Sequence, residues 1–124
     1  MTIIEAIGSI DVLKPNTYPK EQKIKWLSNL DGKIKIEILD THESSNRLQF
    51  EGYNEKTPLN TVLLVTSPYD EIYLRWLEAQ IDYHNGEYGK FNNAIIMFNA
   101  AYDAFAAYYN RTNMPKKHGE RFIF

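Results

Sequence analysis

The feature that most constrains this chain is a ladder of large apolar side chains in its second half. Its members recur at alternating steps of four and three residues: Phe91, Ile95, Phe98, Tyr102, Phe105 and Tyr109. This spacing places all six side chains on one stripe of an α-helix. A second set widens the stripe: Met97, Ala101, Ala104 and Tyr108. Such a helix must lie against other helices or other subunits, so the ladder predicts a mainly helical protein.

The composition excludes several classes of protein. A chain of 124 residues forms one domain with a modest core. Cysteine is absent, which excludes a disulfide scaffold, a thiolate metal site and a cysteine nucleophile. Glu5 stands where a signal peptide needs basic residues, and no apolar stretch approaches the roughly 20 residues of a membrane span. We therefore expect a soluble, intracellular protein.

Two helices are predicted before the middle of the chain. Thr2 and Glu5 have the spacing of a capping box, and Ile3, Ile7 and Ile10 or Leu13 would line the buried face of the helix that follows. The next helix begins near Pro19 and runs to about Asp40. The Asp31-Gly32 pair could divide it, but the apolar period continues through this pair, so we expect one helix.

The region 43–66 lacks a helical period. Leu48 and Phe50 alternate with polar residues, and 62–65 is a short apolar run rich in β-branched residues. We expect a long loop or a β-hairpin here. Connections above about 12–15 residues are usually functional or flexible.

A third helix is predicted to start at Ser67-Pro68, with serine as the cap and proline in the first turn. It is apolar on several sides, which is typical of a central helix. Asn85-Gly86 and Gly89 then predict a turn or sharp kink before the ladder helix, and a single helix through to Asn110 is the alternative. The expected fold is a small bundle of about four helices in a domain 1–110, with an extended C-terminal tail, 111–124.

The net charge of −2 is unevenly distributed along the chain. Residues 1–110 carry −5, whereas the tail carries +3. An acidic body repels nucleic acid, and a basic tail suits an acidic partner. The tail combines basic residues for steering with apolar anchors at its end, so it is a candidate docking segment: Arg111, Lys116, Lys117, Arg121, Phe122, Ile123 and Phe124.

The polar residues give no strong catalytic or metal-binding pattern. His42, His84 and His118 lie far apart, without the spacing of metal ligands. Four charged residues share one face of the third helix and read as a row of salt bridges: Glu71, Arg75, Glu78 and Asp82. The 86–90 segment lacks the pattern of a phosphate loop and predicts a helix-ending turn. We expect no enzyme activity, no cofactor and no metal.

The aromatic ladder also resembles a stacking platform for single-stranded nucleic acid. That role needs basic residues between the aromatic rings, and Asp103 is the only charged residue from Phe91 to Asn110. We therefore expect bundle or subunit packing from the aromatic and apolar residues of the last two helices: Tyr69, Tyr73, Trp76, Phe91, Ile95, Phe98, Tyr102, Phe105 and Tyr109.

Several segments of the sequence resemble structural proteins of tailed-phage and prophage head–tail modules. They are Tyr69-Asp70-Glu71-Ile72-Tyr73-Leu74-Arg75-Trp76-Leu77, Gln80-Ile81-Asp82, Gly86-Glu87-Tyr88, Phe91-Asn92-Asn93, Phe98-Asn99-Ala100-Ala101-Tyr102 and Met114-Pro115. The chain resembles the small helical head–tail connector (adaptor, head-completion) family. The likeness covers Lys14 to Trp26 and most of Pro68 to Pro115.

This resemblance implies a virion protein of the phage neck, made in the cytoplasm of a bacterial host. Members form a homo-oligomeric ring, dodecameric by the same resemblance, beneath the portal protein. The ring extends the DNA channel and presents a surface to the next neck or tail protein, and DNA passes without specific binding. The alternatives are another neck or tail completion protein of the same module, a DNA-packaging or DNA-binding module, and a small enzyme whose site is split between subunits. That enzyme would join His84 with Glu78 or Asp82 in one pocket.

Overall fold

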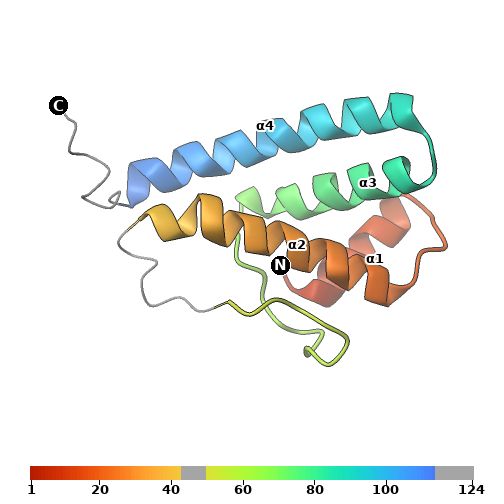
Figure 1. Ribbon diagram of the computed structural model, residues 1–124, viewed down its shortest axis with the longest axis horizontal. Coiled ribbons are helices and arrows are strands. Elements are labelled where there is room, and N and C mark those ends of the chain that lie inside the picture. The colour runs from red at the N-terminus through yellow and green to blue at the C-terminus, as the bar shows by residue number, and fades with distance from the viewer. Residues whose placement is uncertain (43–49, 114–124) are drawn as a thin grey trace.

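The computed structural model describes residues 1–42 and 50–113, and its described part is mainly helical. Four α-helices follow one another along the chain: α1 (Ile3–Leu13), α2 (Lys20–Glu37), α3 (Ile72–His84) and α4 (Tyr88–Thr112). Two short 3-10 helices, η1 (Leu39–Thr41) and η3 (Tyr69–Glu71), accompany α2 and α3. Figure 1 shows α4 running antiparallel to α3 along the long axis of the molecule. The prediction of a small helical bundle is confirmed.

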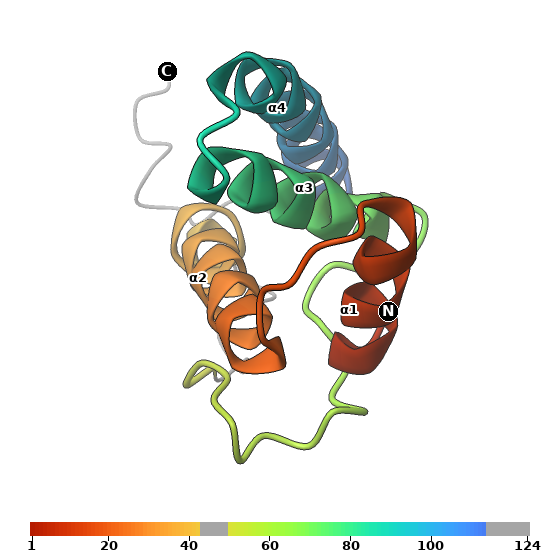
Figure 2. The same cartoon turned by 90° about the vertical axis from the view of Figure 1, so that its right-hand side faces the viewer.

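Helix α3 lies at the centre of the bundle, as its apolar surface on several sides predicted. Seen along the bundle, α4 covers one side of α3, while α1 and α2 cover the other (Figure 2). The fully buried side chains of α3 include Ile72, Tyr73, Leu77 and Ile81. The molecule therefore has one core, and α3 separates α1 from α4.

The first helix begins with the predicted capping box. Thr2 Oγ1 accepts a hydrogen bond from the Glu5 backbone N–H at 3.2 Å, and Glu5 Oε1 accepts one from the Thr2 N–H at 2.9 Å. These bonds satisfy two backbone donors that a helix start leaves unpaired. The backbone hydrogen bond from Thr2 also lowers the pKa of Glu5.

The second helix continues through Asp31 and Gly32 without a break, as expected. It ends at Glu37, and η1 then extends the helical path to Thr41. Two of its polar side chains, Lys23 and Asp31, are buried. The sequence analysis did not predict this burial.

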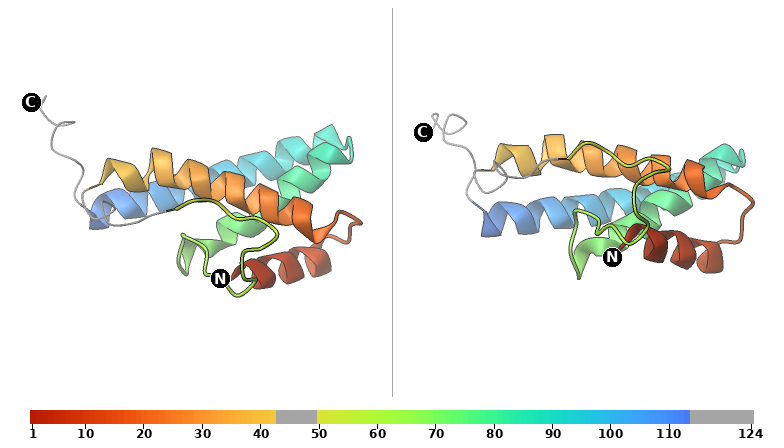
Figure 3. Two further views of the ribbon diagram at one scale, coloured as in Figure 1. Left: turned by 60° about the horizontal axis from the view of Figure 1, so that its bottom comes forward. Right: turned by 90° about the horizontal axis from the view of Figure 1, so that it is seen from below.

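The segment from 50 to 66 contains no regular strand, so its described part does not form the hairpin we considered. A single antiparallel bridge joins Val62 to Thr2, and the Leu63 N–H donates to the Met1 carbonyl at 2.9 Å. Leu63 and Val65 are buried in the core. The 62–65 run therefore reflects burial of Leu63 and Val65 against the helices, because in the described chain its backbone pairs with no other backbone than the start of the chain. Figure 3 shows the segment passing from α2 to the start of α1. Leu48 lies outside the described residues.

Helix α3 does not begin as the sequence predicted. We expected Ser67 to cap it, but η3 precedes the helix, and no side chain caps either element. A hydrogen bond from the Tyr69 N–H to the Thr66 carbonyl at 2.9 Å closes a turn just before η3. As a result, Glu71 stands just before α3 instead of inside it.

Two separate helices, α3 and α4, flank a turn at Gly86, which confirms the interpretation we favoured. Gly86 has a φ of +77°, a conformation that residues with a Cβ rarely adopt. The Glu87 N–H donates to the Asp82 carbonyl at 2.9 Å, and the Gly86 N–H donates to the Tyr83 carbonyl at 3.0 Å. This pair of bonds is a Schellman motif, which ends α3 and reverses the chain.

The boundary predicted for the tail is wrong at its first residues. Arg111 and Thr112 form the last turn of α4 instead of extended chain. The Asn113 N–H closes this turn by donating to the Tyr109 carbonyl at 2.9 Å. Helix α4 is therefore 25 residues long, the longest element in the described part of the chain.

Candidate functional site

The ladder of α4 faces its own chain, which confirms its packing role within the bundle. Phe98 and Phe105 are buried, and the other four members are partly buried. The Phe98 ring lies 4.9 Å from the Trp76 ring, centroid to centroid, and Phe105 lies 6.2 Å from Tyr69. The inner face of α4 is thus covered by α3 and η3.

The predicted packing residues of α3 and η3 also make contacts within the chain. Tyr73 is fully buried, and the Trp76 Nε1–H donates to the Trp26 carbonyl at 2.9 Å. Tyr69 stacks on Tyr108 with 4.7 Å between ring centroids. These side chains therefore belong to the core of the chain itself.

The opposite side of α4 is exposed and carries little charge. We call it the α4 outer face; its exposed members are Asn93, Ile96, Met97, Ala100, Asp103, Ala104 and Ala107. Ile96 is 63% exposed and Met97 is 46% exposed. Met97 and Ala104 had been expected within the covered stripe, and the structure leaves both in solvent. An apolar face of this kind is typical of a surface that another molecule covers.

A second exposed apolar surface lies on α1. We call it the α1 row: Ile4, Gly8 and Val12, spaced four residues apart on one side of the helix. Ile4 is 42% exposed and Val12 is 80% exposed. The buried face uses Ile10, whereas Leu13 is 68% exposed, which decides the alternative left open by the sequence. The spacing of Ile4 and Val12 is a signal in the sequence for this second apolar side of α1.

The core contains a buried carboxylate, that of Asp31 on α2. It is fully buried and accepts hydrogen bonds from the Tyr73 hydroxyl at 2.7 Å, the Tyr53 hydroxyl at 2.6 Å and the Leu64 N–H at 3.1 Å. The Tyr73 hydroxyl in turn accepts from the Val65 N–H at 2.7 Å. Asp31 therefore fastens the 50–66 segment to both α2 and α3.

The sequence offered only a weak signal for this network. Asp31 lies four residues after Leu27 and three before Ile34, on the apolar side of α2, where a lone carboxylate is unusual. Burial raises the pKa of Asp31, and the hydrogen bonds from the two tyrosines and Leu64 partly oppose that rise. Burial and the nearby carboxylate also raise the pKa of both tyrosine hydroxyls.

The raised pKa of Asp31 gives a testable pH dependence. The folded chain holds this proton more tightly than the unfolded chain, so the stability contribution is greatest at acid pH. It is lost as the pH rises from the ordinary aspartate pKa of 3.8 through the raised value. Asp31→Asn should remove this part of the pH dependence. Urea unfolding of the natural chain and of Asp31→Asn, from acid to neutral pH, measures the difference in their free energies of unfolding. A difference that stays constant with pH would contradict the prediction.

The predicted row of salt bridges on α3 is only partly formed. Arg75 Nε lies 3.2 Å from a Glu71 carboxylate oxygen, and Arg75 Nη1 lies 3.8 Å from one of Glu78. Asp82 does not join them, because its buried carboxylate bonds to Lys14 Nζ at 2.7 Å. This bond raises the pKa of Lys14 and ties the end of α1 to the end of α3.

The two histidines in the described residues have structural surroundings. The ring of His42 is buried, with Nδ1 lying 2.7 Å from the Ile38 carbonyl and Nε2 lying 2.8 Å from Asn110 Oδ1. It joins the ends of α2 and α4. His84 is exposed, and its ring lies 5.2 Å from that of Trp26. His118 lies outside the described residues.

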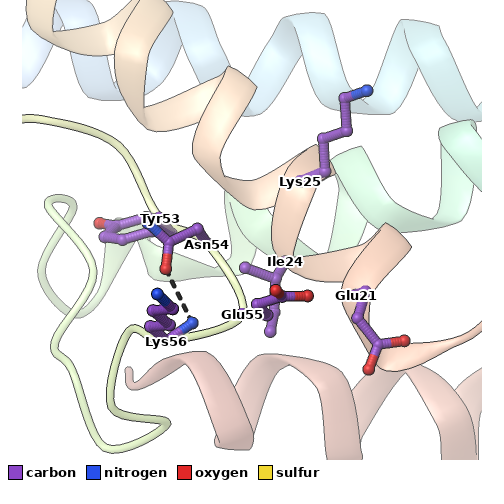
Figure 4. A pocket seen from close by; sticks show the side chains of 7 residues that line it. All are labelled: Glu21, Ile24, Lys25, Tyr53, Asn54, Glu55 and Lys56. Atoms are coloured by element: carbon purple, nitrogen blue, oxygen red, sulfur yellow. Dashed lines mark hydrogen bonds between the residues drawn. The ribbon is translucent and has the colours of Figure 1, made fainter.

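Besides an open hollow of about 530 Å³ lined by Met1, Glu5, Gly8, Ser9 and Asp70, two surface depressions are candidate sites. One, of about 480 Å³, lies between the start of α2 and the 53–56 loop and is lined by Glu21, Ile24, Lys25, Tyr53, Asn54, Glu55 and Lys56. In Figure 4 the Lys25 side chain points away from Asn54 and Lys56, so the polar groups do not converge on one point. The hydroxyl of Tyr53 is held by Asp31.

The second depression, of about 340 Å³, lies between the end of α1 and the start of α3. Its lining is Ile10, Leu13, Lys14, Glu71, Leu74, Arg75 and Glu78. Glu78 therefore lines it without His84 or Asp82, so this depression does not assemble the split enzyme site that we considered. Its four charged side chains take part in the ion pairs described above.

Of the residues proposed for tail docking, only Arg111 lies in the described part, where it is exposed in the last turn of α4. The others lie outside it: Lys116, Lys117, Arg121, Phe122, Ile123 and Phe124. In the ranges 1–42 and 50–113, no helix is both long and apolar enough to cross a membrane. No family model, curated protein or solved structure matches this chain.

Proposed function

We propose that this protein is a structural component of a tailed-phage neck, a ring-forming head–tail connector or adaptor that has no enzyme activity. Its ring docks on the portal, extends the DNA channel and presents a surface to the next neck or tail protein. The observation that carries this proposal is the exposed, nearly uncharged α4 outer face on a small bundle whose own core is already complete. A face of this kind favours a role in assembly.

Two further features support this role. The charge of −5 over residues 1–110 disfavours strong binding to the DNA that passes through the channel. Helices α4 and α1, which carry the α4 outer face and the α1 row, lie on opposite sides of α3 (Figure 2), so these two exposed surfaces belong to helices that α3 separates. Closed rings form from contacts between two different faces of this kind.

In this proposal the tail binds the portal. Arg111 would extend from the end of α4, and the basic and apolar residues from Lys116 to Phe124 would supply steering and anchors. The 43–66 region would contact a neighbour or the next neck protein. The protein would be made in the bacterial cytoplasm and reside in the neck of the virion.

Removal of residues 115–124 tests the docking role of the tail. We expect the shortened chain to lose binding to the portal protein encoded in the same genome, while its helical content and melting temperature stay unchanged. The fold should persist because the described core ends before these residues. Co-sedimentation with portal rings measures the binding, and Asn29→Ala, at an exposed position of α2, serves as the control.

The outcomes separate the parts of the proposal. Portal binding by the shortened chain would remove the tail from the docking role. Failure of the full-length chain to bind portal rings would contradict the proposed function itself. Retardation of duplex DNA by the chain at low salt would instead favour a DNA-binding module.

A further inference from the structure

We propose that residues 50–58 form a lid on helix α2, which opens and closes by itself while the four helices and residues 59–66 stay in place. Tyr53 is the latch of this lid, because it makes both hydrogen bonds that join 50–58 to the helices of the described chain. Figure 3 shows the lid passing along α2 before the chain turns back towards its start. A lid of this kind belongs to the single chain, whatever the chain assembles with.

Burial divides the 50–66 segment into two unequal parts. Leu63 and Val65 are 2% and 0% exposed and belong to the core. Every residue of the lid, in contrast, is exposed or only partly buried. Movement of the lid away from α2 therefore uncovers little apolar surface, whereas movement of residues 63–65 would open the core. Segments with few buried apolar contacts are the ones that open locally in folded proteins.

The part of the segment that follows the lid is paired with the start of the chain. The Ile4 N–H donates to the Leu59 carbonyl, and the Leu63 N–H donates to the Met1 carbonyl, each at 2.9 Å. These backbone bonds hold residues 59–63 against the beginning of α1. The moving part therefore ends just before Leu59.

The lid is attached to α2 through one residue. The Tyr53 N–H donates to Ser28 Oγ at 2.9 Å, and the Tyr53 hydroxyl donates to the Asp31 carboxylate at 2.6 Å. When Tyr53 leaves, Asp31 keeps two donors, the Tyr73 hydroxyl and the Leu64 N–H. Opening thus breaks two hydrogen bonds and leaves the carboxylate held by its other partners.

The lid has internal contacts that opening does not break. The Thr57 N–H donates to the Asn54 carbonyl at 3.0 Å, and the Asn54 N–H donates to Thr57 Oγ1 at 2.9 Å. The rings of Phe50 and Tyr53 pack edge to face with 5.0 Å between their centroids. Because these contacts lie within 50–58, we expect the lid to move as one unit.

The inner side of the lid borders the hollow of about 480 Å³ at the start of α2. The α2 wall of this hollow carries Glu21 and Lys25, and the lid wall carries Glu55 and Lys56. In the part of the chain that the structure describes, no ion pair involves any of the four. Charges therefore do not clamp the lid, and solvent in the hollow can replace the hydrogen bonds of Tyr53 as the lid opens.

The lid gives this side of α2 two alternative surfaces. In the closed form the lid backbone lies close to the helix, since a Cβ added to Gly52 would lie 3.1 Å from Ser28 Oγ. A Cβ added to Gly32 would lie 3.8 Å from the Phe50 ring. In the open form this side of α2, from Ser28 to Gly32, becomes accessible. The chain can thus present either surface without unfolding its helices.

Engineered thiols report the opening, because the natural chain contains no cysteine. Gly32→Cys places a thiol beside the Phe50 ring, where the added Cβ makes an ordinary contact. Val65→Cys places a thiol in the core, and Gly8→Cys places an uncovered thiol on α1. The rate at which each full-length variant reacts with a small aromatic disulfide reagent is measured at several low urea concentrations.

We expect the Gly32→Cys thiol to react more slowly than that of Gly8→Cys but at least about tenfold faster than that of Val65→Cys. Its rate should not change at low urea, because opening of the lid exposes little surface. The rate of Val65→Cys should rise with urea, since the core opens only with the whole fold. Unfolding followed by circular dichroism supplies the same whole-fold urea dependence if Val65→Cys does not fold.

Tyr53→Phe tests the latch, because it removes the hydroxyl that bonds to Asp31. In this variant we expect the Gly32→Cys thiol to react about tenfold faster, as the loss of one hydrogen bond to a carboxylate implies. Tyr18→Phe is the matched control. It removes a 2.7 Å bond from a tyrosine hydroxyl to Asn85, at the turn after α3, and should leave the rate of Gly32→Cys unchanged.

Three results would overturn the proposal. Equal urea dependence of Gly32→Cys and Val65→Cys would show that residues 50–58 open only with the whole fold. A Gly32→Cys thiol that reacts as fast as that of Gly8→Cys would show that no lid covers this side of α2. An unchanged rate in Tyr53→Phe would show that Tyr53 is not the latch.

Discussion

Replacement of Asp31 with alanine is expected to lower the free energy of unfolding by about 3–5 kcal/mol, since an unsatisfied buried donor costs roughly 1–3 kcal/mol. The change removes the acceptor of three donors: the hydroxyls of Tyr53 and Tyr73 and the N–H of Leu64. These donors lie in or beside the core, where water does not readily replace the lost carboxylate. Urea unfolding followed by circular dichroism measures the effect.

The matched control is Asp103→Ala, which removes an exposed carboxylate on α4 and should change the stability by less than about 0.5 kcal/mol. A double-mutant cycle then separates the free energy of the hydrogen bond between two residues from the cost of the cavity that the alanine leaves. If Asp31 and Tyr73 act through their 2.7 Å bond, Tyr73→Phe should cost less in the Asp31→Ala background than in the natural chain. Strictly additive effects would show that the bond does not stabilise the fold.

Limited proteolysis adds a local measurement to the same prediction. Asp31 holds the 50–66 segment through Tyr53 and Leu64, while Ser28 Oγ accepts a further hydrogen bond from the Tyr53 N–H at 2.9 Å. In Asp31→Ala we expect faster cleavage within this segment under conditions where the helices remain folded. Cleavage of the segment at the same rate in Asp31→Ala and in the natural chain would show that the loss of stability arises in the helical core alone.

Replacement of Phe98 with alanine is expected to destabilise the chain by about 3–5 kcal/mol, the usual cost of truncating a buried aromatic side chain. Phe98 is only 3% exposed, and its ring packs against Trp76 between α3 and α4. The change removes a large apolar surface from the contact that joins these two helices. The cavity left behind adds to the cost, because the neighbouring helices relax only in part.

Ile96→Ala is the matched control for Phe98→Ala, because it lies two residues away on the same helix and is 63% exposed. At low protein concentration, where the chain is expected to be monomeric, its effect on stability should stay below about 0.5 kcal/mol. Thermal melts of the two variants provide the comparison. Equal destabilisation by both changes would contradict the division of α4 into an inner and an outer face.

The helices were predictable because their signals are local. The capping box at Thr2 and Glu5, the turn at Gly86 and the period of the ladder each involve residues within a few positions of one another. Two other predictions made from local patterns did not hold. Ser67 was a sound cap by its local sequence, yet η3 precedes the helix there. The 62–65 run had the pattern of a strand, but no neighbouring strand pairs with it in the described chain beyond a single bridge.

The candidate surfaces were only partly predictable for the same reason. The inner ladder of α4 followed from its spacing, and Phe98 and Phe105 are buried as expected. Such a period shows that a helix has one strongly apolar side. It does not predict how many of the apolar residues beside that stripe, such as Met97, the rest of the chain will cover. Met97 remained exposed because α3 and η3 reach only the inner side of α4.

The sequence by itself determined the helical class, the cap of α1, the turn between α3 and α4 and the inward side of α4, since each follows from backbone period or local hydrogen bonding. Only the tertiary structure decided the role of Asp31, whose tyrosine partners lie 22 and 42 residues away. It also decided the pairing of Asp82 with Lys14 across 68 residues. Burial makes such polar groups depend on partners from other elements, and residue spacing along one helix does not encode which elements will meet.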